Sequence, residues 1–165
     1  AAGADYIINI GTAGSHTLPV GTVIQGNGYI KRDVDATLFM RSITENGKLI
    51  FPNFPKFRIP YEDDIVLKPK RLLNDTGLVQ GLVFTGDNTH GHTEVNEDYP
   101  AFACVEMEAY AIAKVCIDAD IPFDSFKVVS DGAGERAGDE WNENADSTPW
   151  SHLLTEIAHN WLLLV

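Results

Sequence analysis

Short apolar runs that end at glycine-containing polar segments are the feature of this sequence that most limits its fold. Such runs are Tyr6–Ile10 before Gly11-Thr12-Ala13-Gly14-Ser15, Val83-Phe84-Thr85 before Gly86-Asp87, and Ile121–Val129 before Ser130-Asp131-Gly132. Buried strands read as short apolar runs, and glycine permits a tight loop after them. Thr22–Ile30 alternates well enough for a further strand. We therefore expect a sheet whose strands end in loops that can lie against a ligand.

Helical patterns separate these runs. Residues 102–119 place apolar side chains on one helix face, at Val105, Ala109, Ile112, Cys116 and Ala119. Residues 150–165 have helical periodicity after a polar start at 147–149. We expect a glycine-rich acidic loop over 131–146, and an irregular segment with short strands over 41–69, which holds four of the eight prolines. Strands separated by helices favour an α/β fold with its site at the carboxyl edge of the sheet.

Composition narrows the possible partners and locations. A length of 165 residues suits one compact domain, so residues 1–165 are expected to form a single domain. The formal charge of −12 repels nucleic acid and anionic membranes. No apolar run approaches the roughly 20 residues that span a bilayer, so we expect a cytoplasmic protein. Cys104 and Cys116 lack the paired spacing of a zinc site and are expected to be buried thiols.

Three carboxylates are the main candidates for chemistry. Glu106 and Glu108 stand near the start of the expected helix, where the helix dipole favours negative charge, and Asp131 ends the next apolar run. If the three carboxylates converge on one pocket, that pocket is suited to hold a sugar and to protonate a base. A solvated helical turn is the other interpretation for Glu106 and Glu108. For Asp131 the alternative is a turn aspartate before Gly132.

Four patches of sequence together resemble a known family. They are Asn9-Ile10-Gly11-Thr12-Ala13-Gly14, Asp33-Val34-Asp35-Ala36-Thr37-Leu38-Phe39, Thr85-Gly86-Asp87, and Val105-Glu106-Met107-Glu108-Ala109 with Val129-Ser130-Asp131. In order and rough spacing they resemble the purine nucleoside phosphorylase and nucleosidase superfamily, and within it the 5′-methylthioadenosine/S-adenosylhomocysteine nucleosidase-like branch. The resemblance runs from residue 1 to about residue 135. It implies a three-layer α/β/α sandwich around a twisted mixed sheet, and a homo-oligomer, with a dimer expected.

The resemblance implies cleavage of the N-ribosidic bond of a purine nucleoside. In such a reaction the purine is protonated while the sugar becomes cation-like. By similarity Asp131 would be the general acid at purine N7 and Ser130 would orient it, while Glu108 would accept hydrogen bonds from the ribose 2′ and 3′ hydroxyls. The other implied substrate-binding residues are Met107 beneath the sugar, Thr12 near the sugar and nucleophile, Asn88 and Thr89 against the base, and Glu106 beside Glu108. No metal or organic cofactor is implied.

The identity of the nucleophile separates a hydrolase from a phosphorylase. Relatives that use phosphate tend to place an arginine where this chain has Val20-Gly21-Thr22, and arginine is the usual ligand of a dianion, so water is favoured. Lys127 stands where the nucleosidases often carry arginine, although an ordinary edge charge is the other interpretation. A phosphate-dependent phosphorylase is therefore one alternative to the hydrolase.

A second alternative is a nucleoside-binding domain that lacks catalysis. Members of the family normally begin with strands that precede anything corresponding to Ala1, and that segment supplies the carboxylate thought to activate water. We therefore expect either a fragment of a longer protein, a site completed by a partner chain, or a domain that binds nucleosides without hydrolysing them.

Two other groups of residues are weaker candidates for a functional site. His90 and His92 with nearby glutamates could form a metal cluster, but a solvated loop is favoured. Asp33 and Asp35 could be a glycosidase dyad, and we assign them no chemistry.

Overall fold

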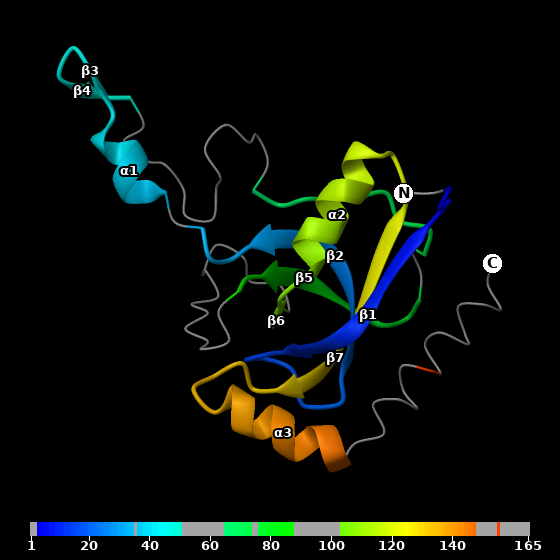
Figure 1. The fold of residues 1–165 in the computed structure, drawn as a ribbon. Helices are drawn as coiled ribbons and strands as arrows, with labels where there is room; N and C mark the ends of the chain where they lie inside the picture. Colours follow the sequence, from blue (N-terminus) through cyan, green and yellow to red (C-terminus); the bar gives the residue numbers. More distant parts are fainter. Residues whose placement is uncertain are drawn as a thin grey trace.

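The fold is seen in a computed structural model, which describes residues 3–34, 36–50, 65–73, 76–87, 103–147 and 155 (Figure 1). Its strands are β1 (Ile7–Gly14), β2 (Val23–Lys31), β3 (Thr44–Glu45), β4 (Lys48–Leu49), β5 (Val79–Thr85), β6 (Ala103–Glu106) and β7 (Phe123–Asp131). Its helices are α1 (Thr37–Ser42), α2 (Ala109–Asp118) and α3 (Ala137–Ser147). None of the helices in these residues is long and apolar enough to cross a membrane.

A mixed sheet forms the centre of the molecule. Its strands are hydrogen-bonded in the order β1-β6-β5-β2-β7 and close into a barrel. The β1–β7, β2–β5 and β5–β6 pairs are parallel, whereas β1–β6 and β2–β7 are antiparallel. Helix α2 packs against β2 and β5, and α3 packs against β7 on the other side of the sheet (Figure 1). The predicted α/β fold with a twisted mixed sheet between helices is confirmed, and the sheet curls far enough for its outer strands to pair.

Strand β1 is longer than the sequence pattern predicted. Gly11–Gly14, expected to be a loop, continues the strand, because β1 pairs in parallel with β7 from Ile7↔Phe123 to Gly14↔Asp131. A Cβ atom on Gly14 would collide with the Asp131 carboxylate and lie 2.9 Å from the Ala133 Cβ. The glycine is therefore needed for close approach of two strands, and not for a turn. The strands predicted over 22–30, 83–85 and 121–129 are confirmed as β2, β5 and β7, although β5 begins earlier, at Val79.

The helix predicted over 102–119 begins later than expected. Ala103–Glu106 forms β6, which pairs with β5 as far as Thr85↔Glu106. Helix α2 starts at Ala109 because the Glu106 carboxylate accepts hydrogen bonds from the backbone N–H groups at its start, which lack partners within the helix. The buried face of α2 contains Ala109 and Cys116, as predicted, together with Tyr110 and Ala113.

Helix α3 lies where a loop was predicted. Asp139 and Glu140 stand in its first turn, where the helix dipole favours negative charge. Glu140 also accepts a hydrogen bond from the N–H of Gly132 at 2.8 Å, and Asn144 donates to the carbonyl of Ser130 at 2.8 Å. These contacts with the β7 end stabilise a helix that has few apolar side chains of its own. The helix predicted over 150–165 lies outside the described residues, apart from Thr155, which is helical.

The remaining segments agree with their predictions where they are described. The short strands β3 and β4 form a hairpin within 41–69, next to α1 and away from the barrel (Figure 1), while residues 51–64 lie outside the described part. Cys104 and Cys116 are buried free thiols, as predicted. Burial raises the pKa of the Cys104 thiol to about 12, so it stays protonated and unreactive at neutral pH.

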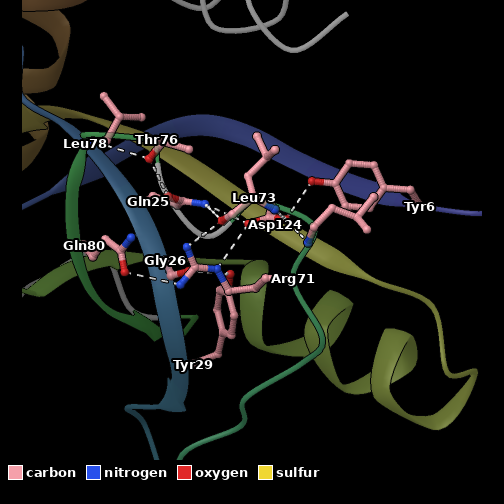
Figure 2. A network of polar contacts seen from close by, with 11 residues as sticks. Tyr6, Gln25, Gly26, Tyr29, Arg71, Leu73, Thr76, Leu78, Gln80 and Asp124 are labelled. Atoms are coloured by element: carbon pink, nitrogen blue, oxygen red, sulfur yellow. Dashed lines mark hydrogen bonds and ion pairs between the residues drawn. The ribbon is translucent and has the colours of Figure 1, made fainter. Parts of the chain in front are cut away.

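A polar network closes the start of β7 (Figure 2). The fully buried Asp124 carboxylate accepts hydrogen bonds from the Tyr6 hydroxyl at 2.7 Å and from the Gln25 amide at 2.8 Å. It also accepts from the N–H of Leu72 at 3.0 Å and forms an ion pair with Arg71 at 3.3 Å. Burial and the hydrogen bond to Asp124 raise the pKa of Tyr6 above its ordinary value. The network fastens the segment before β5 to the beginnings of β1, β2 and β7.

Replacing Asp124 by Asn should destabilise the fold by about 3 kcal/mol, because it leaves the Arg71 guanidinium without its buried anion. Urea denaturation measures the change. Asp118→Asn is the matched control: its partner Lys114 is exposed, and the loss should stay below about 1 kcal/mol. Equal losses in the two variants would contradict a structural role for the network.

Candidate active site

A cavity of about 580 Å³ lies where the carboxyl ends of β1, β6 and β7 meet. The strands converge there because Gly14 pairs with Asp131 on one side and with Val105 on the other. Six of the predicted site residues line the cavity, namely Thr12, Glu106, Met107, Glu108, Ser130 and Asp131. The other two, Asn88 and Thr89, lie outside the described residues. The predicted convergence of three carboxylates is therefore confirmed, although their roles remain predictions.

Asp131 is held in place by its immediate neighbours. One carboxylate oxygen accepts a hydrogen bond from the Ser130 hydroxyl at 2.8 Å, and the other accepts from the N–H of Ala133 at 2.9 Å. The Ser130 hydroxyl also lies 3.3 Å from the carbonyl of Ala13 in β1. Asp131 thus makes the contact of a turn aspartate, and the same side chain lines the cavity. This arrangement gives the carboxyl group a defined orientation toward a bound ligand.

Glu106 is not the solvated turn residue that one interpretation proposed. Its side chain is 2% exposed and forms an ion pair with the Lys127 ammonium at 2.9 Å. The Lys127 side chain is equally buried, so the interpretation of Lys127 as an edge charge is wrong. The sequence did not reveal the pair because its members lie on β6 and β7, far apart along the chain.

Glu108 and Met107 differ from Glu106 in their exposure. Both are exposed side chains on the wall of the cavity. Glu108 immediately precedes α2 but makes no side-chain capping hydrogen bond, since Glu106 accepts from the helix N–H groups instead. The Glu108 carboxylate is therefore placed to accept hydrogen bonds from the hydroxyl groups of a ligand.

The cavity also contains residues that sequence reasoning missed. Trp141 and Asn142 contribute from α3, and the Trp141 indole N–H donates to the Thr12 hydroxyl at 3.4 Å. Trp141 lies in a segment that was expected to be a loop, so its place on a helix beside the cavity was not predicted. Arg32, which follows β2, adds a guanidinium whose side chain is 9% exposed. A single arginine after a strand carries no signal that would have singled it out.

The chemistry of the lining fits a ligand with several distinct parts. Carboxylates can bind hydroxyl groups or a protonatable ring nitrogen, and Met107 and Trp141 offer apolar surface. Within the described residues no group of three or more His, Cys, Asp or Glu side chains could hold a metal ion. The candidate cluster at His90 and His92 lies outside these residues, and the absence of a cofactor stays a prediction.

Comparisons with known proteins identify the family. Residues 1–153 match the family model of the phosphorylase superfamily. The 5′-methylthioadenosine/S-adenosylhomocysteine nucleosidase of Geobacillus sp. (strain WCH70) is 34% identical over 152 residues, which are 87% of this chain and 63% of that protein. The enzyme of the same name from Colwellia psychrerythraea is 32% identical over 152 residues, which are 84% of this chain and 60% of that protein. The chain thus spans about three fifths of these relatives.

Solved structures show the same fold as this chain. The Colwellia psychrerythraea nucleosidase in complex with adenine matches with a TM-score of 0.63 and 26% identity, over 85% of this chain and 60% of that one. The futalosine hydrolase of Helicobacter pylori shares the fold, with a TM-score of 0.69 and 21% identity over 92% of this chain and 66% of that one. With its family model matched over almost the whole length, the chain belongs to the phosphorylase superfamily.

Proposed function

We propose that this protein hydrolyses the N-ribosidic bond of a purine nucleoside and releases the free base. The observation that supports it most is the meeting of Asp131, at the end of β7, with Met107 and Glu108, between β6 and α2, in one cavity. The names of the relatives favour 5′-methylthioadenosine, S-adenosylhomocysteine or a similar adenine nucleoside as the substrate.

In this proposal Asp131 protonates the departing purine. Cleavage moves electrons from the N-ribosidic bond into the purine ring, and a proton at N7 neutralises the charge that develops there. Ser130 and the Ala133 N–H hold the carboxyl group in position, so little reorientation is needed at the moment of transfer. After the transfer, both hydrogen bonds stabilise the carboxylate that remains.

The other wall of the cavity holds the sugar. Glu108 accepts hydrogen bonds from the 2′ and 3′ hydroxyls, and Met107 packs beneath the ribose. Trp141 supplies apolar surface beside Thr12, which suits an apolar 5′ substituent. Binding the ribose at two hydroxyls fixes the sugar carbon at which the nucleophile attacks, and this lowers the entropic part of the barrier.

Water is the proposed nucleophile, and phosphate is the second candidate. Arg32 is the observation that favours phosphate, because its guanidinium lines a cavity whose other charged side chains are acidic. Guanidinium groups bind phosphate oxygens in a bidentate manner, which ammonium groups cannot do. The two reactions differ in whether turnover requires added phosphate.

We also propose that the protein acts as a homodimer. Leu38 and Phe39 on α1 are 84% and 64% exposed, on a part of the chain that lies away from the barrel (Figure 1). Burial of such side chains against a second copy would remove apolar surface from water. The single-domain organisation and the cytoplasmic location stay predictions.

Incubating the protein with 5′-methylthioadenosine, S-adenosylhomocysteine, adenosine and inosine, with and without phosphate, should release adenine from at least one of them in both buffers. Chromatography of the free base is the measurement. Release only with phosphate would identify a phosphorylase. Tight nucleoside binding without release in either buffer would indicate a binding domain and contradict the hydrolase.

Replacing Asp131 by Asn should slow base release by about 10²- to 10⁴-fold, because the amide has the same shape but no acidic proton. Nucleoside affinity, measured by calorimetry, should stay within about tenfold, a change of roughly 1.4 kcal/mol. Asp139→Asn, on the exposed side of α3, is the control and should leave the rate unchanged. Full activity of Asp131→Asn would remove Asp131 from the role of general acid.

Replacing Glu108 by Gln should weaken ribose recognition, because a neutral amide accepts hydrogen bonds less strongly than a carboxylate. The preference for ribonucleosides over 2′-deoxyribonucleosides, taken as a ratio of kcat/KM values, should fall by about tenfold. An unchanged ratio would exclude Glu108 from the ribose site.

A further inference from the structure

A buried ion pair lies beneath the wall of the cavity. The Lys127 ammonium, which β7 supplies, is 2.9 Å from the carboxylate of Glu106 at the end of β6. Each side chain is 2% exposed. Taking two such charges out of water is unfavourable unless their geometry is good and further hydrogen bonds satisfy them. We therefore expect the buried ion pair to have a role beyond charge neutralisation.

The Glu106 carboxylate is fully occupied within the protein. Its two oxygens accept hydrogen bonds from the Thr85 hydroxyl, from the N–H of Glu108 at 3.1 Å, and from the N–H of Ala109 at 3.0 and 2.9 Å. With the Lys127 ammonium added, these donors use the roughly four acceptor sites that a carboxylate offers. A substrate hydroxyl would have to displace one of them.

The same contacts fix the backbone that carries Met107 and Glu108. Two consecutive N–H groups, those of Glu108 and Ala109, are bound to one carboxylate, so the chain between β6 and α2 has a defined path. The Thr85 hydroxyl, which donates to Glu106, in turn accepts from the N–H of Tyr110 at 2.9 Å. Strand β5, strand β7 and the start of α2 thus meet at Glu106.

We propose that Lys127 and Glu106 are positioning residues, which hold Glu108 at the ribose hydroxyls without touching the substrate. The proposal rests on the hydrolase function proposed above. It assigns opposite roles to two glutamates that are two positions apart: Glu106 binds the protein and Glu108 binds the sugar. It replaces the substrate-binding role that the sequence suggested for Glu106.

Gly11 is part of the same arrangement. It pairs with Lys127 across the β1–β7 ladder, and a Cβ atom at Gly11 would lie 3.4 Å from the Lys127 ammonium nitrogen. This is an ordinary van der Waals distance, so Gly11 and the Lys127 ammonium are neighbours within the fold.

The test compares adenosine and 2′-deoxyadenosine binding by calorimetry in Asp131→Asn, which should bind nucleosides without rapid cleavage, and in the same variant carrying Lys127→Met or Glu106→Gln. We expect Asp131→Asn to prefer adenosine, and each added substitution to reduce that preference by about fivefold or more, because Glu108 is no longer held at the hydroxyls. Lys127→Arg keeps the cation and should retain the preference within about twofold. Lys114→Met, which removes an exposed lysine on α2, is the matched control and should change nothing.

A folded Lys127→Met or Glu106→Gln variant with an undiminished preference would overturn the proposal, and circular dichroism establishes that each variant is folded. If Lys127→Met does not fold, the nearly isosteric Glu106→Gln decides. Asp131→Asn without any preference for adenosine would overturn it as well. Base release by the wild type is scored separately, so failure of the hydrolase is seen there while the binding ratios still test the positioning role.

Discussion

Parallel pairing of β1 with β7 decides where the site residues meet. Because the register runs from Ile7↔Phe123 to Gly14↔Asp131, the two strands end together and place the general-acid candidate beside a residue without a side chain. The β1–β6 contact at Gly14↔Val105 then brings the carboxylates of the β6 end to the same place. The pairing shifts by one residue between Ala13↔Val129 and Gly14↔Asp131, so Ser130 is the extra residue and Asp131 comes to lie opposite Gly14.

Much of the barrel could be predicted from the sequence, because its strands are buried apolar runs with the residue types that favour strands. The predictions that were wrong concern residues whose contacts are remote in sequence. Gly14 read as a turn residue, but the Asp131 carboxylate and Ala133 explain it. Helix α3 has few apolar side chains, and its contacts with the β7 end carry no periodic signal.

The candidate site shows the same division between local and remote information. Asp131 and Glu108 could be recognised from their motifs, since each stands next to an element boundary that short-range patterns locate. The burial of Glu106 could not be predicted, because the positive charge that stabilises its buried carboxylate comes from Lys127 on another strand. Two glutamates with the same local context thus have different surroundings, and only the tertiary structure distinguishes them.

The Asp124 network and the cavity lie toward opposite ends of β7, with Asp124 near the start of the strand and Asp131 at its end. The Asp124 network is therefore separated along β7 from the residues that line the cavity. A substitution at the carboxyl ends of these strands can therefore change what the cavity binds without removing a contact of the Asp124 network.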